Sequence, residues 1–284
     1  MARLYPRLLP NGEPEASDVI ASVFEKEGIK VIPGRVESVR SEGAGCGHAA
    51  SCRLSNGSIR TVPGDLLLVA AGRDPVTSGM NLEGIGVMLR SEGGGGVSVD
   101  DKLRTSARGV YAAGDCTGDR QFTHYAGYQG AVAARNALLP LTDPGVLGDV
   151  PSTTFTDPEV AEVGMTEAQA VEQYGEGAVE VAVQLVKDVD RAICDGATDG
   201  VIKVVYRKRN YQILGASIVS PTAGEMISEI SVAMKTGLTF DMLATVMHTY
   251  PSYSFALQSM AANVYYKKLL KSKGILSFLK KLGL

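Results

Sequence analysis

Two short stretches of this sequence combine residue types that can do chemistry, and the first is GVYAAGDCTGD at residues 109–119. Small apolar residues run directly into Gly114 and Asp115. Glycine lets a backbone approach a ligand without a Cβ in the way, and a carboxylate accepts hydrogen bonds from sugar hydroxyls. By itself Gly-Asp is more often a simple turn. A short buried strand before it favours a nucleotide site, because α/β folds bind ligands at the carboxyl ends of their strands.

The second stretch is MHTYPSYSFALQ at residues 247–258. An imidazole titrates near neutral pH, so His248 is a candidate acid–base group, although capping a loop is an equal alternative. Tyr250 precedes Pro251, and a phenol with an ordinary pKa of about 10 is a poor base at neutral pH. It can still donate a hydrogen bond or contact a soft metal complex. We therefore take His248 and Tyr250 as the candidate catalytic residues.

A helix is predicted soon after the Gly-Asp pair, over residues 125–139. The turn before it holds Phe122, Thr123 and His124. The free N–H groups and the positive dipole end of a helix N-terminus suit an electron-rich ligand. This turn is therefore a second part of the candidate binding site.

The elements around these residues predict two kinds of architecture. An amphipathic helix over 16–27 precedes a short strand over 29–32, and the apolar run over 65–72 has the length of a strand buried on both faces. Such strands, followed by helices, are typical of a layered α/β nucleotide-binding domain. After a proline-rich segment, strands and then helices are grouped together. This grouping predicts an α+β second domain over residues 146–270.

Composition narrows the function classes. The chain has 284 residues, a net charge of −3 and no run of about 20 apolar residues, which argues against nucleic-acid binding and a membrane span. Four scattered cysteines predict a reducing compartment, the cytoplasm or an organellar stroma or matrix. Cys46, His48 and Cys52 do not have the spacing of a structural zinc site, so no metal site is predicted. The lysine-rich segment 271–284 is interpreted as an amphipathic tail, with weak membrane-surface contact as the alternative.

Several motifs together resemble the pyridine nucleotide–disulfide oxidoreductases. LLLVAAGRDP (66–75) and LRTSARGVYAAGDCTG (103–118) are similar to the family's paired A-x-G-R-x-P and T-x-x-x-x-[IV]-[YF]-A-x-G-D signatures. VPSTTFTDPEVAEVGMTEAQA (150–170) resembles the start of its dimerisation domain. DRAICDGATDGVIKVVY (190–206) is similar to the mercuric reductase branch. The resemblance covers most of the chain.

The resemblance implies FAD and NAD(P)H as cofactors and a homodimer as the assembly. It implies that Asp115 holds the ribityl chain of FAD, that the turn at 122–125 meets the flavin, and that Gly72 lies under the nicotinamide nucleotide. Val36 corresponds to a strand position on the adenosine side, although a strand valine is ordinarily core. The expected domains are parts of an NAD(P) domain (1–75) and an FAD domain (76–145), the dimerisation domain and the tail.

Some of the family's parts are not recognisable. The G-x-G-x-x-G phosphate loops and the C-x4-C redox dithiol have no match, and GAGCGH at 43–48 is interpreted as a hairpin loop. Tyr250 stands where the family has the histidine before proline, and Phe255 where it has the orienting glutamate. The branch shares this tyrosine, but the chain's LKKLGL end lacks the branch's metal-capturing cysteine pair.

We therefore expect the chain to correspond to the C-terminal portion of an FAD-dependent NAD(P)H oxidoreductase that acts on a small-molecule acceptor. Two alternatives stay open. One is a catalytically inert dimerisation or interaction module that keeps the family fold. The other is a quinone or diaphorase-type reductase that works without a dithiol.

Overall fold

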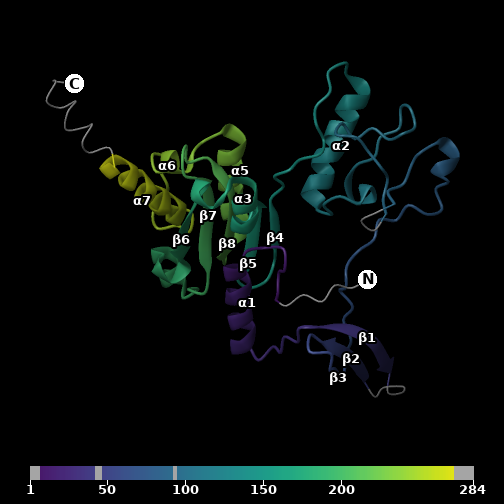
Figure 1. Cartoon of the computed structure of the whole chain (residues 1–284), viewed down its shortest axis with the longest axis horizontal. Coiled ribbons are helices and arrows are strands. Elements are labelled where there is room, and N and C mark those ends of the chain that lie inside the picture. The colour runs from purple at the N-terminus through teal and green to yellow at the C-terminus, as the bar shows by residue number, and fades with distance from the viewer. Residues whose placement is uncertain (1–6, 42–46, 92–94, 272–284) are drawn as a thin grey trace. The chain divides into compact units, whose positions relative to one another are not determined.

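The computed structural model describes residues 7–41, 47–91 and 95–271 (Figure 1). These residues form two compact units. One contains the chain up to Leu67 together with everything from Pro151 onward, and the other runs from Leu68 to Val150. Within the described residues, no helix is long and apolar enough to cross a membrane.

The larger unit is built on a five-stranded antiparallel sheet with the strand order β4-β5-β8-β7-β6. Two neighbouring inner strands, β7 and β8, are buried along almost their whole length, which explains why their sequences are rich in valine and isoleucine. The antiparallel sheet and its grouped helices confirm the α+β architecture predicted for this part of the chain. The strands are β4 (Ser152–Thr154), β5 (Glu159–Gly164), β6 (Val179–Leu185), β7 (Val201–Arg207) and β8 (Ile213–Ser220).

Alternating residues of the central strands supply two separate cores. Ile202 and Ile218 belong to the large core that includes residues of α5 (Ala223–Thr236), α6 (Phe240–Leu243) and α7 (Phe255–Lys271). Their chain neighbours Val201 and Val219 instead pack with Ala16 and Ile20 of α1 (Pro14–Lys26). Because successive side chains of a strand point to opposite faces, α1 covers the face of the sheet opposite α5–α7.

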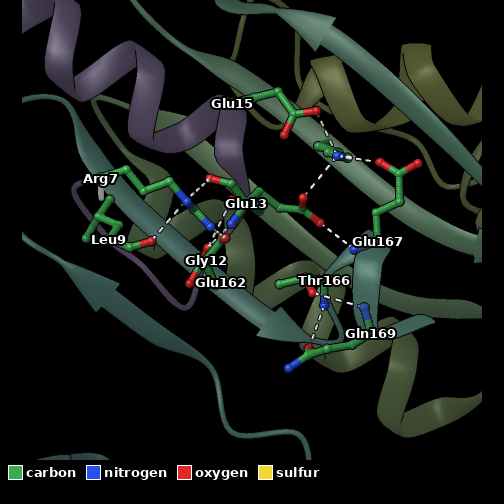
Figure 2. Close-up of polar contacts among 11 residues, drawn as sticks. Arg7, Leu9, Gly12, Glu13, Glu15, Glu162, Thr166, Glu167 and Gln169 are labelled. Carbon is green, nitrogen blue, oxygen red and sulfur yellow. Dashed lines mark hydrogen bonds and ion pairs between the residues drawn. The ribbon is translucent and has the colours of Figure 1, made fainter. Parts of the chain in front are cut away.

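A buried lysine on β7 anchors α1 to the sheet through the carboxylates of Glu13, Glu15 and Glu167, which are labelled in Figure 2. The Lys203 side chain is only 3% exposed, and its Nζ lies 2.6–3.0 Å from carboxylate oxygens of Glu13, Glu15 and Glu167. Glu13 is also held through its backbone N–H, which donates to Glu162 Oε1 at 3.2 Å. The start of α1 is therefore fixed by charge as well as by apolar packing.

Shorter helices complete this unit. The first, α3 (Glu167–Tyr174), begins with a capping box in which the Thr166 hydroxyl accepts from the Gln169 N–H, and the Gln169 side chain accepts from the Thr166 N–H. That arrangement fixes Glu167 at the first position of the helix, next to Lys203. The others are α4 (Asp190–Asp195), η3 (Glu176–Ala178) and η4 (Val186–Asp188).

A separate three-stranded antiparallel sheet follows α1, in the order β1-β2-β3. The predicted helix over 16–27 is confirmed as α1. The strand predicted over 29–32 is wrong: the segment has no strand structure, and Ile29 and Val31 are close to half exposed. No described strand pairs with it, and an unpaired segment cannot satisfy a sheet's hydrogen bonds. The strands are β1 (Gly34–Ser41), β2 (His48–Leu54) and β3 (Ile59–Gly64).

The smaller unit contains one long helix, α2 (Thr123–Leu138), as predicted, and the short helices η1 (Glu83–Ile85) and η2 (Gly114–Thr117). Among its described residues, strand pairing is limited to the isolated bridges Leu89–Val97 and Arg104–Tyr111. The buried strand predicted over 65–72, a segment that crosses the boundary between the units, is absent, and Leu66 and Leu68 are 92% and 89% exposed. A strand buried on both faces needs neighbouring strands and covering helices, and no described segment pairs with this one.

Candidate functional site

The Gly114–Asp115 pair lies at the start of η2 in the smaller unit. Gly114 has a φ of 76°, and a Cβ at this position would come within 2.8 Å of the Cβ of Ala126 on α2. Its N–H donates to the buried Gln129 Oε1 at 2.7 Å. The sequence needs glycine here because the backbone is in the left-handed region and lies against the helix. The next side chain, Asp115, is left half exposed, at 48%.

Arg73 brings the two sequence signatures of this unit together. Its Nη1 lies 3.6 Å from Asp115 Oδ2, and its Nη2 donates to the Gln121 carbonyl at 2.7 Å. Both side chains of this ion pair are largely exposed, so it contributes little to stability. Through its two contacts, Arg73 nevertheless links the Asp115 carboxylate to the turn before α2. The carboxylate keeps free acceptor capacity for a hydroxyl-bearing ligand.

The turn before α2 places the predicted residues at a helix N-terminus. Phe122 is the N-cap in an extended conformation, without a side-chain cap, and Thr123 is the first helical residue. The rings of Phe122 and His124 stack with centroids 5.4 Å apart and an interplanar angle of 11°. A helix N-terminus suits electron-rich ligand atoms, and no side chain caps this one. The Asp115 carboxylate adds a hydrogen-bond acceptor in the same unit.

Two other predicted residues make no described contact with this set. Gly72 has a φ of 126° with open space where a Cβ would point, so a ligand could approach its backbone closely. Val36 lies on β1 opposite Cys52 and is 54% exposed. No described contact joins either residue to Asp115.

The histidine of the second stretch is buried against α5. The His248 side chain is 7% exposed, and its Nε2 lies 2.6 Å from Glu229 Oε1. Its Nδ1 lies 2.9 Å from the Val246 carbonyl oxygen. Both ring nitrogens thus contact oxygen atoms of the chain, and neither is left to face a ligand.

Tyr250 is the residue that this stretch presents to solvent. It is 60% exposed, and its hydroxyl donates to Asp190 Oδ2 at 2.8 Å. Its ring meets Phe255 edge-on at 5.2 Å. With Arg191 and Ser252, these residues line a surface pocket of about 90 Å³. The hydrogen bond to the Asp190 carboxylate raises the pKa of Tyr250, so this phenol is a still weaker base at neutral pH.

Sequence reasoning missed three partners of the predicted residues. Arg73 follows Gly72 inside the first signature, so its position was visible but its contact with Asp115 was not. Glu229 and Asp190 lie 19 and 60 residues before the groups they contact. No local spacing could identify them.

One cluster of carboxylates in the larger unit has the spacing of a metal site. Oxygen atoms of Glu13, Glu15 and Glu167 lie within 4.8 Å of one another, but the Lys203 ammonium already occupies the space they share. Of the Cys46–His48–Cys52 set, Cys46 lies outside the described residues. His48 and Cys52 are four residues apart on β2, or roughly 13 Å along a strand. These two residues cannot bind one ion together.

Profiles of one known protein family match two consecutive parts of the chain. The family profile for pyridine nucleotide-disulphide oxidoreductases matches residues 3–130, and the profile for the dimerisation domain of the same family matches residues 150–261. The chain is 36% identical to a mercuric reductase of Bacillus cereus over 86% of this chain and 38% of that protein. It is 32% identical to a dihydrolipoyl dehydrogenase of Corynebacterium glutamicum over 91% and 55%, respectively. The chain therefore spans about half the length, or less, of these relatives.

Solved structures give the same result. The crystal structure of LpdA from Mycobacterium tuberculosis superposes with a TM-score of 0.81 at 31% identity, over 92% of this chain and 55% of that one. The copper(II) complex of RclA, a flavoprotein disulfide reductase from Escherichia coli, superposes with a TM-score of 0.81 at 28% identity, over 92% and 57%. The chain thus combines a nucleotide-binding part with an antiparallel dimerisation domain, and it belongs to the pyridine nucleotide–disulphide oxidoreductase family.

Proposed function

We propose that this chain supplies part of the flavin site of an FAD-dependent NAD(P)H oxidoreductase that resembles mercuric reductase. The observation that carries this proposal is the half-exposed Asp115 carboxylate. It directly follows Gly114, whose left-handed backbone conformation favours glycine. It lies in the same compact unit as the uncapped start of α2. When bound, FAD would supply the hydride-accepting isoalloxazine ring. The chain's own residues would accept hydrogen bonds at Asp115 and donate them from the helix N-terminus.

The proposal is tested by measuring flavin retention. The purified chain is incubated with FAD and desalted, and its visible absorption is compared with that of Asp115→Ala and Asp101→Ala. Asp101 is an exposed aspartate of the same unit. We expect a flavin band in the wild type and the control, and its loss in Asp115→Ala. A colourless wild-type chain, or equal retention in all three, contradicts the proposal and favours an inert scaffold that keeps the family fold.

The dimerisation domain supports a homodimer as the assembly. In this proposal, residues 1–75 and 76–145 are parts of the NAD(P) and FAD domains, Gly72 and Val36 face the pyridine nucleotide, and 146–270 form the dimer contact. Sedimentation velocity should give twice the mass of one chain. The thiols of Cys52, Cys116 and Cys194 are free, which supports the cytoplasm or another reducing compartment.

A second candidate activity rests on Tyr250 and its partner. A tyrosine whose pKa is raised by Asp190 cannot serve as the base of a dithiol at neutral pH. This feature favours direct transfer from flavin to a small-molecule acceptor such as a quinone. NADH oxidation that requires a quinone and is insensitive to thiol alkylation would support that candidate. Turnover that alkylation abolishes would contradict it.

A further inference from the structure

We propose that Glu229 and His248 form a positioning pair for Tyr250. The inference goes beyond the flavin site and rests on the proposed function only in that Tyr250 is the group presented to the acceptor. It starts from the loop between α6 and α7, where His248 and Tyr250 are two residues apart. The loop reaches α5 through one of these residues and α4 through the other.

The attachment to α5 is made by His248. Its buried imidazole uses both nitrogens, one toward Glu229 at 2.6 Å and the other toward the Val246 carbonyl at 2.9 Å. The second contact joins the His248 side chain to the backbone two residues earlier. The first joins His248 to a carboxylate that is only 26% exposed, on a helix packed in the large core. A charge-assisted hydrogen bond in such a site is stronger than an exposed one.

The attachment to α4 is made by the tyrosines. Tyr250 donates to Asp190 at 2.8 Å, and Tyr253 donates to Asp195 at 3.1 Å. Asp195 is held in turn by Arg191 at 2.9 Å. A tyrosine that is 60% exposed has many rotamers and backbone positions available. Fixing residue 248 reduces that freedom, because only two peptide units then separate the anchor from the Tyr250 Cα.

The imidazole is therefore assigned as a positioning residue and not as a catalytic one. His248 is not among the residues that line the pocket, whereas Tyr250 and Asp190 are. Removing the Glu229 carboxylate should leave the fold intact but should let the loop move. The Tyr250 phenol would then spend less time bonded to Asp190, and its pKa would fall toward the ordinary tyrosine value.

The experiment follows Tyr250 in the full chain without added cofactor. Tyrosine is labelled with ¹³C in the ring, the Tyr250 resonance is assigned with Tyr250→Phe, and its pH titration is recorded by NMR. Asp190→Asn removes the carboxylate that accepts from Tyr250. The decrease in the Tyr250 pKa that it causes is the reference for the other variants. We expect Glu229→Ala to give a shift comparable with that of Asp190→Asn, and Glu229→Gln, which keeps an acceptor for His248, to give a smaller one.

The controls separate positioning from charge. Glu225→Gln removes an exposed carboxylate one turn earlier on α5 and should leave the Tyr250 titration unchanged. The series is repeated at high salt, because a through-space charge effect is screened whereas a positional one persists. A Tyr250 titration that is identical in wild type and Glu229→Ala, or a shift that salt abolishes, overturns the proposal. Either result is independent of whether the chain retains FAD.

Discussion

The ammonium nitrogen of Lys203 lies 3.0 Å from Glu13 Oε2, and both side chains are almost completely removed from solvent, at 3% and 5% exposure. The two residues are 190 positions apart in the chain. This ion pair joins the start of α1 to the centre of the sheet in the dimerisation domain. Residues matched to the nucleotide-binding profile are thereby held against residues matched to the dimerisation profile.

Lys203→Met should destabilise the larger unit by about 3 kcal/mol or more, because it leaves buried carboxylate charge without a partner. Urea unfolding followed by circular dichroism measures this change in the free energy of unfolding. The matched control is Lys26→Met, which removes the exposed ion pair with Asp199. That change should cost less than about 1 kcal/mol. Equal effects of the two substitutions would show that the buried cluster is not what holds α1.

The same cluster predicts how stability depends on pH. Although burial raises it, the hydrogen bond from Lys203 leaves the pKa of Glu15 below its ordinary value of 4.5. A lowered carboxyl pKa contributes stability that is present above pH 4.5 and is lost as the pH falls through the folded value. Unfolding free energies measured from pH 7 down to pH 3 should therefore fall less steeply in Glu15→Gln than in wild type. Glu27→Gln, at an exposed position, should follow the wild-type curve.

Glu162→Gln should make the larger unit more stable at high pH, because the ionised Glu162 carboxylate opposes folding there. Burial raises the pKa of the Glu162 carboxyl, so its ionisation opposes folding once the pH exceeds the ordinary carboxyl value. Glutamine keeps the oxygen that accepts from the Glu13 N–H and from the Ser217 hydroxyl. We expect a higher melting temperature than wild type at pH 8 and a smaller difference at pH 4. A variant that is less stable than wild type at pH 8 would refute this prediction.

Gly114→Ala should destabilise the smaller unit by about 1–3 kcal/mol. Alanine would have to adopt the left-handed backbone conformation of Gly114, and its Cβ would collide with Ala126. Amide hydrogen exchange along α2 reports this change directly. Gly127→Ala is the matched control: it lies on α2 with open space at its Cβ and an ordinary φ. It should leave exchange unchanged or slow it, since alanine is the better helix former by about 1 kcal/mol. Faster exchange in both variants would contradict the role given to Gly114.

Leu66→Ser and Leu68→Ser together should reduce binding of an environment-sensitive apolar dye. The two leucines are 92% and 89% exposed, within the run of six apolar residues 66–71. Contiguous exposed apolar side chains bind such dyes and promote association. Dye fluorescence and light scattering should both decrease, whereas Thr61→Ser on the neighbouring β3 should change neither. Unchanged fluorescence in the double variant would mean that the dye binds elsewhere.

Much of the fold was predictable because its signals are local. Apolar periodicity predicted α1, and the grouping of strands and then helices predicted the α+β architecture of the dimerisation domain. The same rule failed over residues 65–72. An apolar run indicates a strand only where neighbouring strands are available to pair with it, and the described residues provide none.

By itself, the sequence determined the family, through its motifs, and the α+β class of the dimerisation domain, since motifs and periodicity are properties of neighbouring residues. The tertiary structure alone decided that Glu229 contacts His248, that Asp190 accepts a hydrogen bond from Tyr250, and that Lys203 pairs with three glutamates. These contacts join residues from 19 to 190 positions apart. Burial and charge bring such residues together only after the sheet and its helices have packed, so no spacing along the chain records them.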